Sequence, residues 1–111
     1  MWQRSHAIAV ALNGTARRFA PGAAPELRSQ ILRASPSIPA NIAEGANQES
    51  DAQFARFRSI AIGSANELQN HLVFAGDIGL LEPVETETIL AQLIEVRRML
   101  YGLRKRLHAS R

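Results

Sequence analysis

The chain has 111 residues, a formal net charge of +3 and no cysteine. This length predicts one domain over residues 1–111, and the lack of cysteine excludes a disulfide framework and a thiolate metal site. There is no run of 18 apolar residues to cross a membrane and no signal-peptide hydrophobic region, so we expect a cytoplasmic protein without membrane association.

The first helical pattern covers residues 2–19. Apolar or small residues recur every three or four positions, which is the spacing of one packed helix face: Trp2, Ser5, Ala9, Leu12, Ala16 and Phe19. Pro21 and Gly22 then interrupt the pattern.

The second pattern begins at Pro25, because proline suits the first turn of a helix. Pro36 and Pro39 fall inside it, yet the apolar spacing continues past both. We therefore predict one helix that is kinked at these prolines and continues to about Glu44, with Gly45 as its C-cap. Its buried face comprises Leu27, Ile31, Ala34, Ile38 and Ile42.

The third helix is predicted to begin at about Asp51, because Ser50 and Gln53 have the spacing of a capping box. Its buried face comprises Phe54, Phe57, Ala61, Ser64, Leu68, Leu72 and Ala75. Gly63 lies in mid-helix, where glycine costs roughly 1 kcal/mol relative to alanine, so we expect another helix to approach closely there.

The fourth helix is predicted to start near Pro83. It carries the most regular apolar spacing in the chain, at Ile89, Leu93, Val96, Leu100, Leu103 and Leu107. Four such helices joined by short loops predict an all-α, up-down-up-down four-helix bundle.

The third and fourth helices also carry apolar residues outside these faces: Ile60, Ile62, Phe74, Leu90, Ile94 and Tyr101. One interpretation is a wider buried surface formed by self-association. The other is a broad core face within a single copy.

Two stretches resemble the motifs of a bacterial family, the 23S rRNA intervening-sequence proteins. The first is Ser37-Ile38-Pro39-Ala40-Asn41-Ile42-Ala43-Glu44-Gly45, and the second is Gly63-Ser64-Ala65-Asn66-Glu67-Leu68. The resemblance covers nearly the whole chain and includes Trp2, Gln3, Gln30, Arg33, Phe54, Arg56, Phe57 and Leu72.

This resemblance implies a four-helix bundle that assembles as a homo-oligomer, typically a pentameric ring, without enzymatic activity. The family is also similar to the accessory variability determinant of diversity-generating retroelements, which binds nucleic acid and a reverse transcriptase. Family members usually carry glycine and basic residues after the signature glycine. Here residues 46–49 read Ala-Asn-Gln-Glu and contain no basic residue.

Asn41, Glu44 and Glu67 are the polar residues of these motifs that could carry chemistry. A functional interpretation makes the two glutamates a carboxylate pair for metal or acid–base chemistry, although neither has a histidine three residues later. A structural interpretation has these side chains satisfy backbone groups left open by the two prolines, or pair with Arg33. No cofactor fingerprint is present, and the three histidines are too scattered in the helical pattern to form a zinc ligand set.

Charge is distributed unevenly in the predicted bundle. One end would collect Arg4, Arg56, Arg58, Arg104, Lys105, Arg106 and Arg111 against Glu44, Glu49 and Asp51. This excess predicts a surface for RNA or DNA. The alternative is charge placement that complements helix dipoles, but this accounts only for the fourth helix.

The sequence therefore favours a non-enzymatic, self-assembling four-helix bundle that binds nucleic acid or an RNA-associated protein. The alternatives are a protein scaffold without nucleic-acid binding and a small metal-dependent enzyme that uses Glu44 and Glu67.

Overall fold

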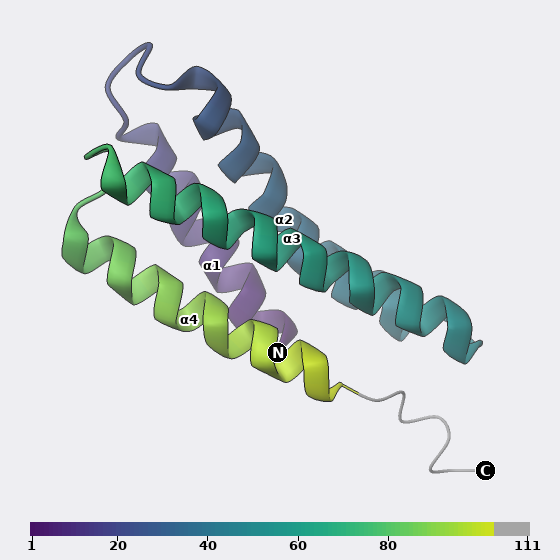
Figure 1. Ribbon diagram of the computed structural model, residues 1–111. Helices are drawn as coiled ribbons and strands as arrows, with labels where there is room; N and C mark the ends of the chain where they lie inside the picture. The colour runs from purple at the N-terminus through teal and green to yellow at the C-terminus, as the bar shows by residue number, and fades with distance from the viewer. Residues whose placement is uncertain (104–111) are drawn as a thin grey trace.

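The structure is a computed structural model, and it describes residues 1–103. It contains four helices over this range, namely α1 (Trp2–Arg17), α2 (Pro25–Ala46), α3 (Asp51–Asp77) and α4 (Pro83–Gly102). Figure 1 shows the four helices assembled into one bundle. The predicted all-α four-helix bundle is therefore confirmed.

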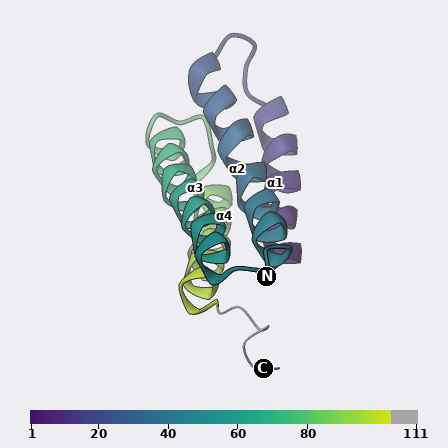
Figure 2. The same ribbon diagram turned by 90° about the vertical axis from the view of Figure 1, so that its right-hand side faces the viewer.

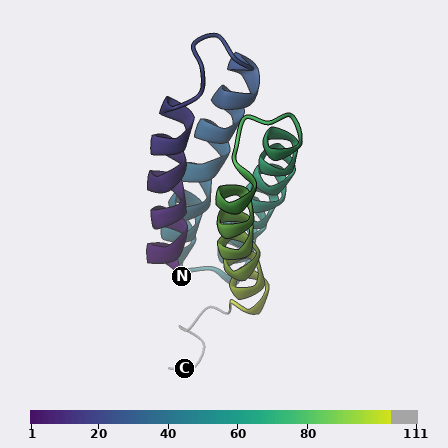
Figure 3. The same ribbon diagram turned by 90° about the vertical axis from the view of Figure 1, so that its left-hand side faces the viewer.

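The helices form a closed cycle of neighbours. α2 packs on α1 and on α3, and α4 packs on α3 and, least closely, on α1. Figures 2 and 3 show the α1–α2 and α3–α4 loops at one end of the bundle, with the N-terminus and the α2–α3 loop at the other. The α2–α3 pair and the α1–α4 pair therefore lie on opposite sides of the molecule.

Local sequence signals explain where the helices start. The backbone N–H of Gln53 donates to the Ser50 hydroxyl at 3.1 Å, which confirms the predicted cap of α3. Pro25 and Pro83 each occupy the first turn of their helices, as predicted. The residue before α2 is Ala24, whose φ of 44° lies in the left-handed region that alanine seldom adopts.

The core lies along the axis between the four helices, and all four contribute to it. Its largest fully buried apolar side chains are Leu12, Ile31, Ile38, Leu68, Leu72, Leu93, Val96 and Leu100. Most of the predicted faces are confirmed, but α1 buries Ile8 and not Trp2, which is 41% exposed. In α3, Ala65 is buried, whereas Phe57 and Ser64 are half-buried.

Helix α2 continues through both internal prolines, as predicted. Ile38 is buried in the core, as predicted, and Pro39 is buried as well. Ile42, which was also predicted to lie in the core, is only partly buried and packs against it. The predicted end of α2 is also slightly wrong, because the helix runs to Ala46 and Asn47 follows as its C-cap. The kink at Pro36 and Pro39 stays a prediction.

The glycines have different roles from those predicted. Gly45 is not a C-cap but a buried packing residue, since an added Cβ would lie 3.2 Å from the Cβ of Phe57 on α3. The sequence predicts the close approach of another helix at Gly63, yet Gly63 is exposed, and an added Cβ would meet nothing within 4 Å among residues 1–103. The close approach of α2 and α3 therefore occurs at Gly45.

Candidate functional site

The two motif stretches meet on one side of the bundle, where α2 packs against α3. The hydroxyl groups of Ser37 and Ser64 lie 2.8 Å apart and share a hydrogen bond. The Asn41 side-chain amide donates to the Ser37 carbonyl at 2.8 Å and to its hydroxyl at 3.1 Å. These polar groups connect the two helices and satisfy one another, so they stabilise the α2–α3 contact.

The expected role of Asn41 at the prolines is wrong in detail. Pro36 and Pro39 have no N–H to donate to the carbonyls four residues earlier, those of Leu32 and Ser35. Asn41 binds the Ser37 carbonyl, which neither proline affects. Its side chain therefore reinforces the helix and the serine contact.

Glu44 and Glu67 are both exposed. A carboxylate oxygen of Glu67 lies 3.3 Å from Nε2 of His71, one turn further along α3, and no ion pair joins Glu67 to Arg33 in the described structure. Within residues 1–103, no group of three or more histidine, aspartate and glutamate side chains could hold a metal ion. The described side chains thus provide no metal-based support for the carboxylate-pair interpretation.

The predicted basic end is described only in part. Arg4 is exposed in the first turn of α1, and Arg56 is exposed near the start of α3, with its guanidinium 5.9 Å from the centre of the Phe57 ring. Arg58 is half-buried on the same helix. The remaining predicted nucleic-acid contacts, Arg104, Lys105 and Arg106, lie outside the described residues.

Arg58 contacts the chain at the end of α4. Its Nη1 donates to the Leu103 carbonyl at 2.9 Å, and its Nε is buried without a hydrogen-bond partner among residues 1–103. The carbonyls at a helix C-terminus favour a positive charge. Arg58 therefore joins α3 to the end of α4, a role that no local pattern in the sequence indicates.

The described part of this end carries no excess charge. Its three arginines, Arg4, Arg56 and Arg58, are offset by three carboxylates, Glu44, Glu49 and Asp51. The positive excess comes from residues 104–111, which carry Arg104, Lys105, Arg106 and Arg111 and no acidic side chain. The positive excess predicted for this end therefore rests on residues outside the described range.

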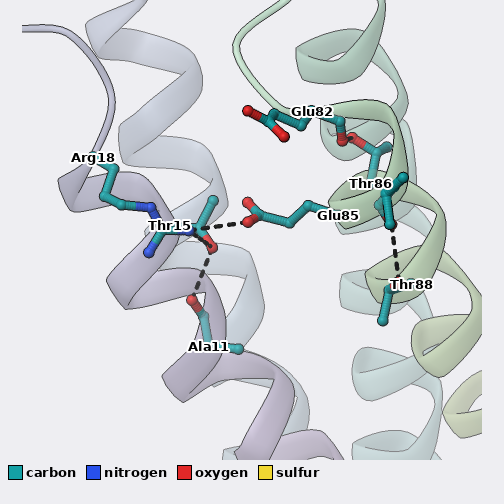
Figure 4. A network of polar contacts seen from close by, with 8 residues as sticks. Ala11, Thr15, Arg18, Glu82, Glu85, Thr86 and Thr88 are labelled. Atoms are coloured by element: carbon teal, nitrogen blue, oxygen red, sulfur yellow. Dashed lines mark hydrogen bonds and ion pairs between the residues drawn. The ribbon is translucent and has the colours of Figure 1, made fainter.

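At the opposite end, an ion pair joins Arg18, the residue that follows α1, to Glu85 of α4. Arg18 donates to Glu85 at 3.0 Å and also lies 3.4 Å from the Thr15 hydroxyl (Figure 4). The hydroxyls of Thr15 and Thr86 donate hydrogen bonds to the carbonyls of Ala11 and Glu82, each one turn earlier in the chain. Arg18 is well exposed, so this pair contributes at most about 1 kcal/mol.

The apolar residues outside the main core faces fall into two groups. Ile62 and Leu90 pack against the core and Ile94 is half-buried, which fits a broad core face. Three others remain exposed, namely Ile60 (39%), Phe74 (54%) and Tyr101 (61%). The core of one copy therefore accounts for only part of this apolar surplus.

A groove of about 660 Å³ runs between α1 and α4, on the side opposite the motif contact. Three exposed alanines line it, together with polar side chains: Arg4, Ala7, Ala11, Ala91, Gln92 and Glu95. The groove lies between α1 and α4, the two neighbouring helices that pack least closely in the bundle.

These features define an all-α four-helix bundle whose two motif stretches form one interhelical contact. The chain belongs to the 23S rRNA-intervening sequence protein family, whose model matches residues 1–102. No helix in the described residues is long and apolar enough to cross a membrane.

The fold is similar to that of a solved protein of unknown function from the S23 ribosomal protein family of Bacteroides thetaiotaomicron. The two share 25% sequence identity with a TM-score of 0.85, and the match covers 91% of this chain and 94% of the other. A comparison with curated proteins found no significant match. The family and fold are thus established, and neither comparison names an activity.

Proposed function

We propose that this protein is a non-enzymatic, self-associating four-helix bundle. One observation carries the proposal: Ile60, Phe74 and Tyr101 stay exposed on helices whose core faces are already filled. Large apolar side chains outside a complete core favour association, because burial removes their surface from water. The pentameric ring implied by the family resemblance and the cytoplasmic location both stay predictions.

Sedimentation equilibrium over a micromolar range of concentrations tests this proposal. A single copy has a mass of 12.2 kDa, and we expect a concentration-dependent mass well above it. A homogeneous monomer throughout this range would rule out self-association under these conditions.

Polyanion binding is a second proposed function, favoured by the charge of residues 104–111. One copy offers only a modest excess, but a ring that presents this end of every copy on one face would multiply it. Binding would consist mainly of phosphate contacts, because the segment is rich in arginine and has no aromatic residue. The competing possibility is a scaffold that binds only protein.

A further inference from the structure

Two exposed aromatic side chains stack on the surface of α1. The rings of Trp2 and His6 have their centroids 4.7 Å apart, with an angle of 10° between their planes. Both side chains are exposed, Trp2 to 41%, and neither belongs to the buried core. The stack holds the indole ring in a fixed orientation while leaving part of it in contact with water. Another flat ring can therefore cover it by the offset stacking that aromatic pairs prefer.

The Trp2–His6 pair lines a groove of about 470 Å³ between α1 and α2. We call it the Trp2–His6 groove. The rest of its lining is mostly short apolar side chains, such as Val10 and Pro36. Asn13 adds an amide that can both donate and accept hydrogen bonds. An apolar hollow with an aromatic wall and one amide suits a planar heterocycle that carries polar groups on its edge.

The charges around the groove favour an anionic occupant. No acidic residue lines it, and α1 contains none. The two acidic residues of α2, Glu26 and Glu44, lie outside the lining. Arg17 follows Asn13 by four residues and so shares its side of α1. It is exposed and makes no ion pair within residues 1–103.

The position of the groove relates it to the basic residues 104–111. Figure 3 shows the start of α1, which carries Trp2, at the same end of the bundle as the end of α4, which these residues follow in the chain. Residues 104–111 supply positive charge but no aromatic ring, whereas the groove supplies aromatic rings. Positive charge combined with aromatic side chains is the arrangement that binds single-stranded nucleic acid.

We propose that the Trp2–His6 groove binds an unpaired base of single-stranded nucleic acid, stacked on the indole ring of Trp2. This inference rests on the proposed polyanion binding and names its substrate class. Trp2 and Arg17 are about 22 Å apart along α1, at 1.5 Å per residue, so a bound strand extends over several nucleotides between them. Bases within a duplex are already stacked on both sides and do not reach the groove.

Trp2 is the only tryptophan in the chain, so its fluorescence reports on the groove directly. Titration of the full chain with oligoadenylate RNA should change this fluorescence, because a stacked base alters the surroundings of the indole. A DNA duplex of equal length should bind through its phosphates and leave the fluorescence unchanged. In fluorescence anisotropy, Trp2→Ala should weaken oligoadenylate binding about tenfold and leave duplex binding unchanged. Trp2→Phe keeps a flat ring and should retain most of the affinity.

Val73→Ala is the matched control, since Val73 on α3 is also 41% exposed and lies outside the groove. It should bind both nucleic acids as the parent does, and circular dichroism should show all variants folded. The inference is wrong if Trp2→Ala affects both nucleic acids equally, or if saturation with oligoadenylate leaves Trp2 fluorescence unchanged; polyanion binding would then stand. A fluorescence change that depends only on protein concentration would also overturn it, by assigning the groove to a second copy. A parent that binds neither nucleic acid would overturn both proposals.

Discussion

A side chain added at Gly45 would contact Phe57, whereas one added at Gly63 would meet open space among residues 1–103. The two sites should therefore respond differently to alanine in the free energy of unfolding. Gly63→Ala adds a methyl group in open space and raises helix propensity, so we expect the free energy of unfolding to rise by up to about 1 kcal/mol. The measurement is chemical denaturation at a concentration where the chain is monomeric. A loss of stability would mean that Gly63 already contacts a neighbour.

Gly45→Ala should have the opposite effect. Its new methyl group would lie 3.2 Å from the Cβ of Phe57, which is attached directly to the α3 backbone and cannot rotate away. Overpacking of about 1–3 kcal/mol would exceed the propensity gain of about 1 kcal/mol, so we expect a net loss of about 1 kcal/mol. The same denaturation experiment measures it, with Gly63→Ala as the reference. Equal stabilisation of both variants would contradict the packing described here.

The partial burial of Ile42 changes what its truncation should cost. Full burial would predict a loss of about 2–5 kcal/mol for Ile42→Ala, the range for core isoleucines. Ile42 lies at the edge of the core, so we expect less, about 1–2 kcal/mol, because the apolar area removed from water is smaller. Ile38→Ala, four residues earlier in the same helix and fully buried, provides the comparison. A larger loss at Ile42 would indicate that it is buried in solution.

At the scale of elements, Arg58 connects α3 to the end of α4. Arg58→Gln removes the charge-assisted hydrogen bond to the Leu103 carbonyl, and we expect a loss of about 1–2 kcal/mol. Hydrogen exchange should quicken in the last turn of α4 and stay unchanged in α1. Arg56→Gln is the control two residues away, where the guanidinium is exposed. Equal effects of the two substitutions would show that Arg58 does not act through this contact.

The sequence predicted elements better than their contacts. Helix starts depend on groups close together in the sequence, such as the Ser50 hydroxyl that caps α3. A short stretch of sequence is therefore enough to predict where a helix begins. The spacing of apolar residues likewise predicted most of the buried side chains. The rotation of α3 depends on which neighbours it packs against, so the sequence did not indicate that Ala65 would be more buried than Ser64.

The candidate site was less predictable than the fold for the same reason. The motif residues Ser37 and Ser64 are 27 positions apart, and only the packing of α2 on α3 brings their hydroxyls together. Charge alone groups Arg58 with the other basic residues, and the sequence does not indicate its contact with Leu103 because the two residues are 45 positions apart. Residue type indicated what these groups could do, whereas the fold determines what they contact.

At the scale of the whole molecule, charge beyond α4 governs the proposed polyanion binding. Affinity for RNA and for duplex DNA should fall steeply with salt, through release of counterions from the phosphates. Arg104→Glu combined with Arg106→Glu should weaken binding and flatten the salt dependence. Fluorescence anisotropy at several salt concentrations measures both quantities.

Arg28→Glu combined with Arg33→Glu is the matched control, because these exposed α2 arginines give the same change in charge elsewhere. It should reduce binding less than the Arg104 and Arg106 pair does. Equal losses would indicate non-specific attraction to the whole molecule. No binding by the parent even at about 50 mM salt, where phosphate contacts are strong, would favour the scaffold that binds only protein.

The packing of α2 on α3 also has a consequence for the order in which the bundle forms. A loop of only four residues, 47–50, joins these helices, whereas the Arg18–Glu85 pair spans 67 positions. Contacts close in sequence lose less chain entropy when they form, so we expect the α2–α3 hairpin to be structured in the folding transition state before α1 meets α4. Ile38→Val should then slow folding, while Leu12→Ala in α1 should mainly speed unfolding in stopped-flow measurements. The reverse pattern would place the folding nucleus on the other side of the bundle.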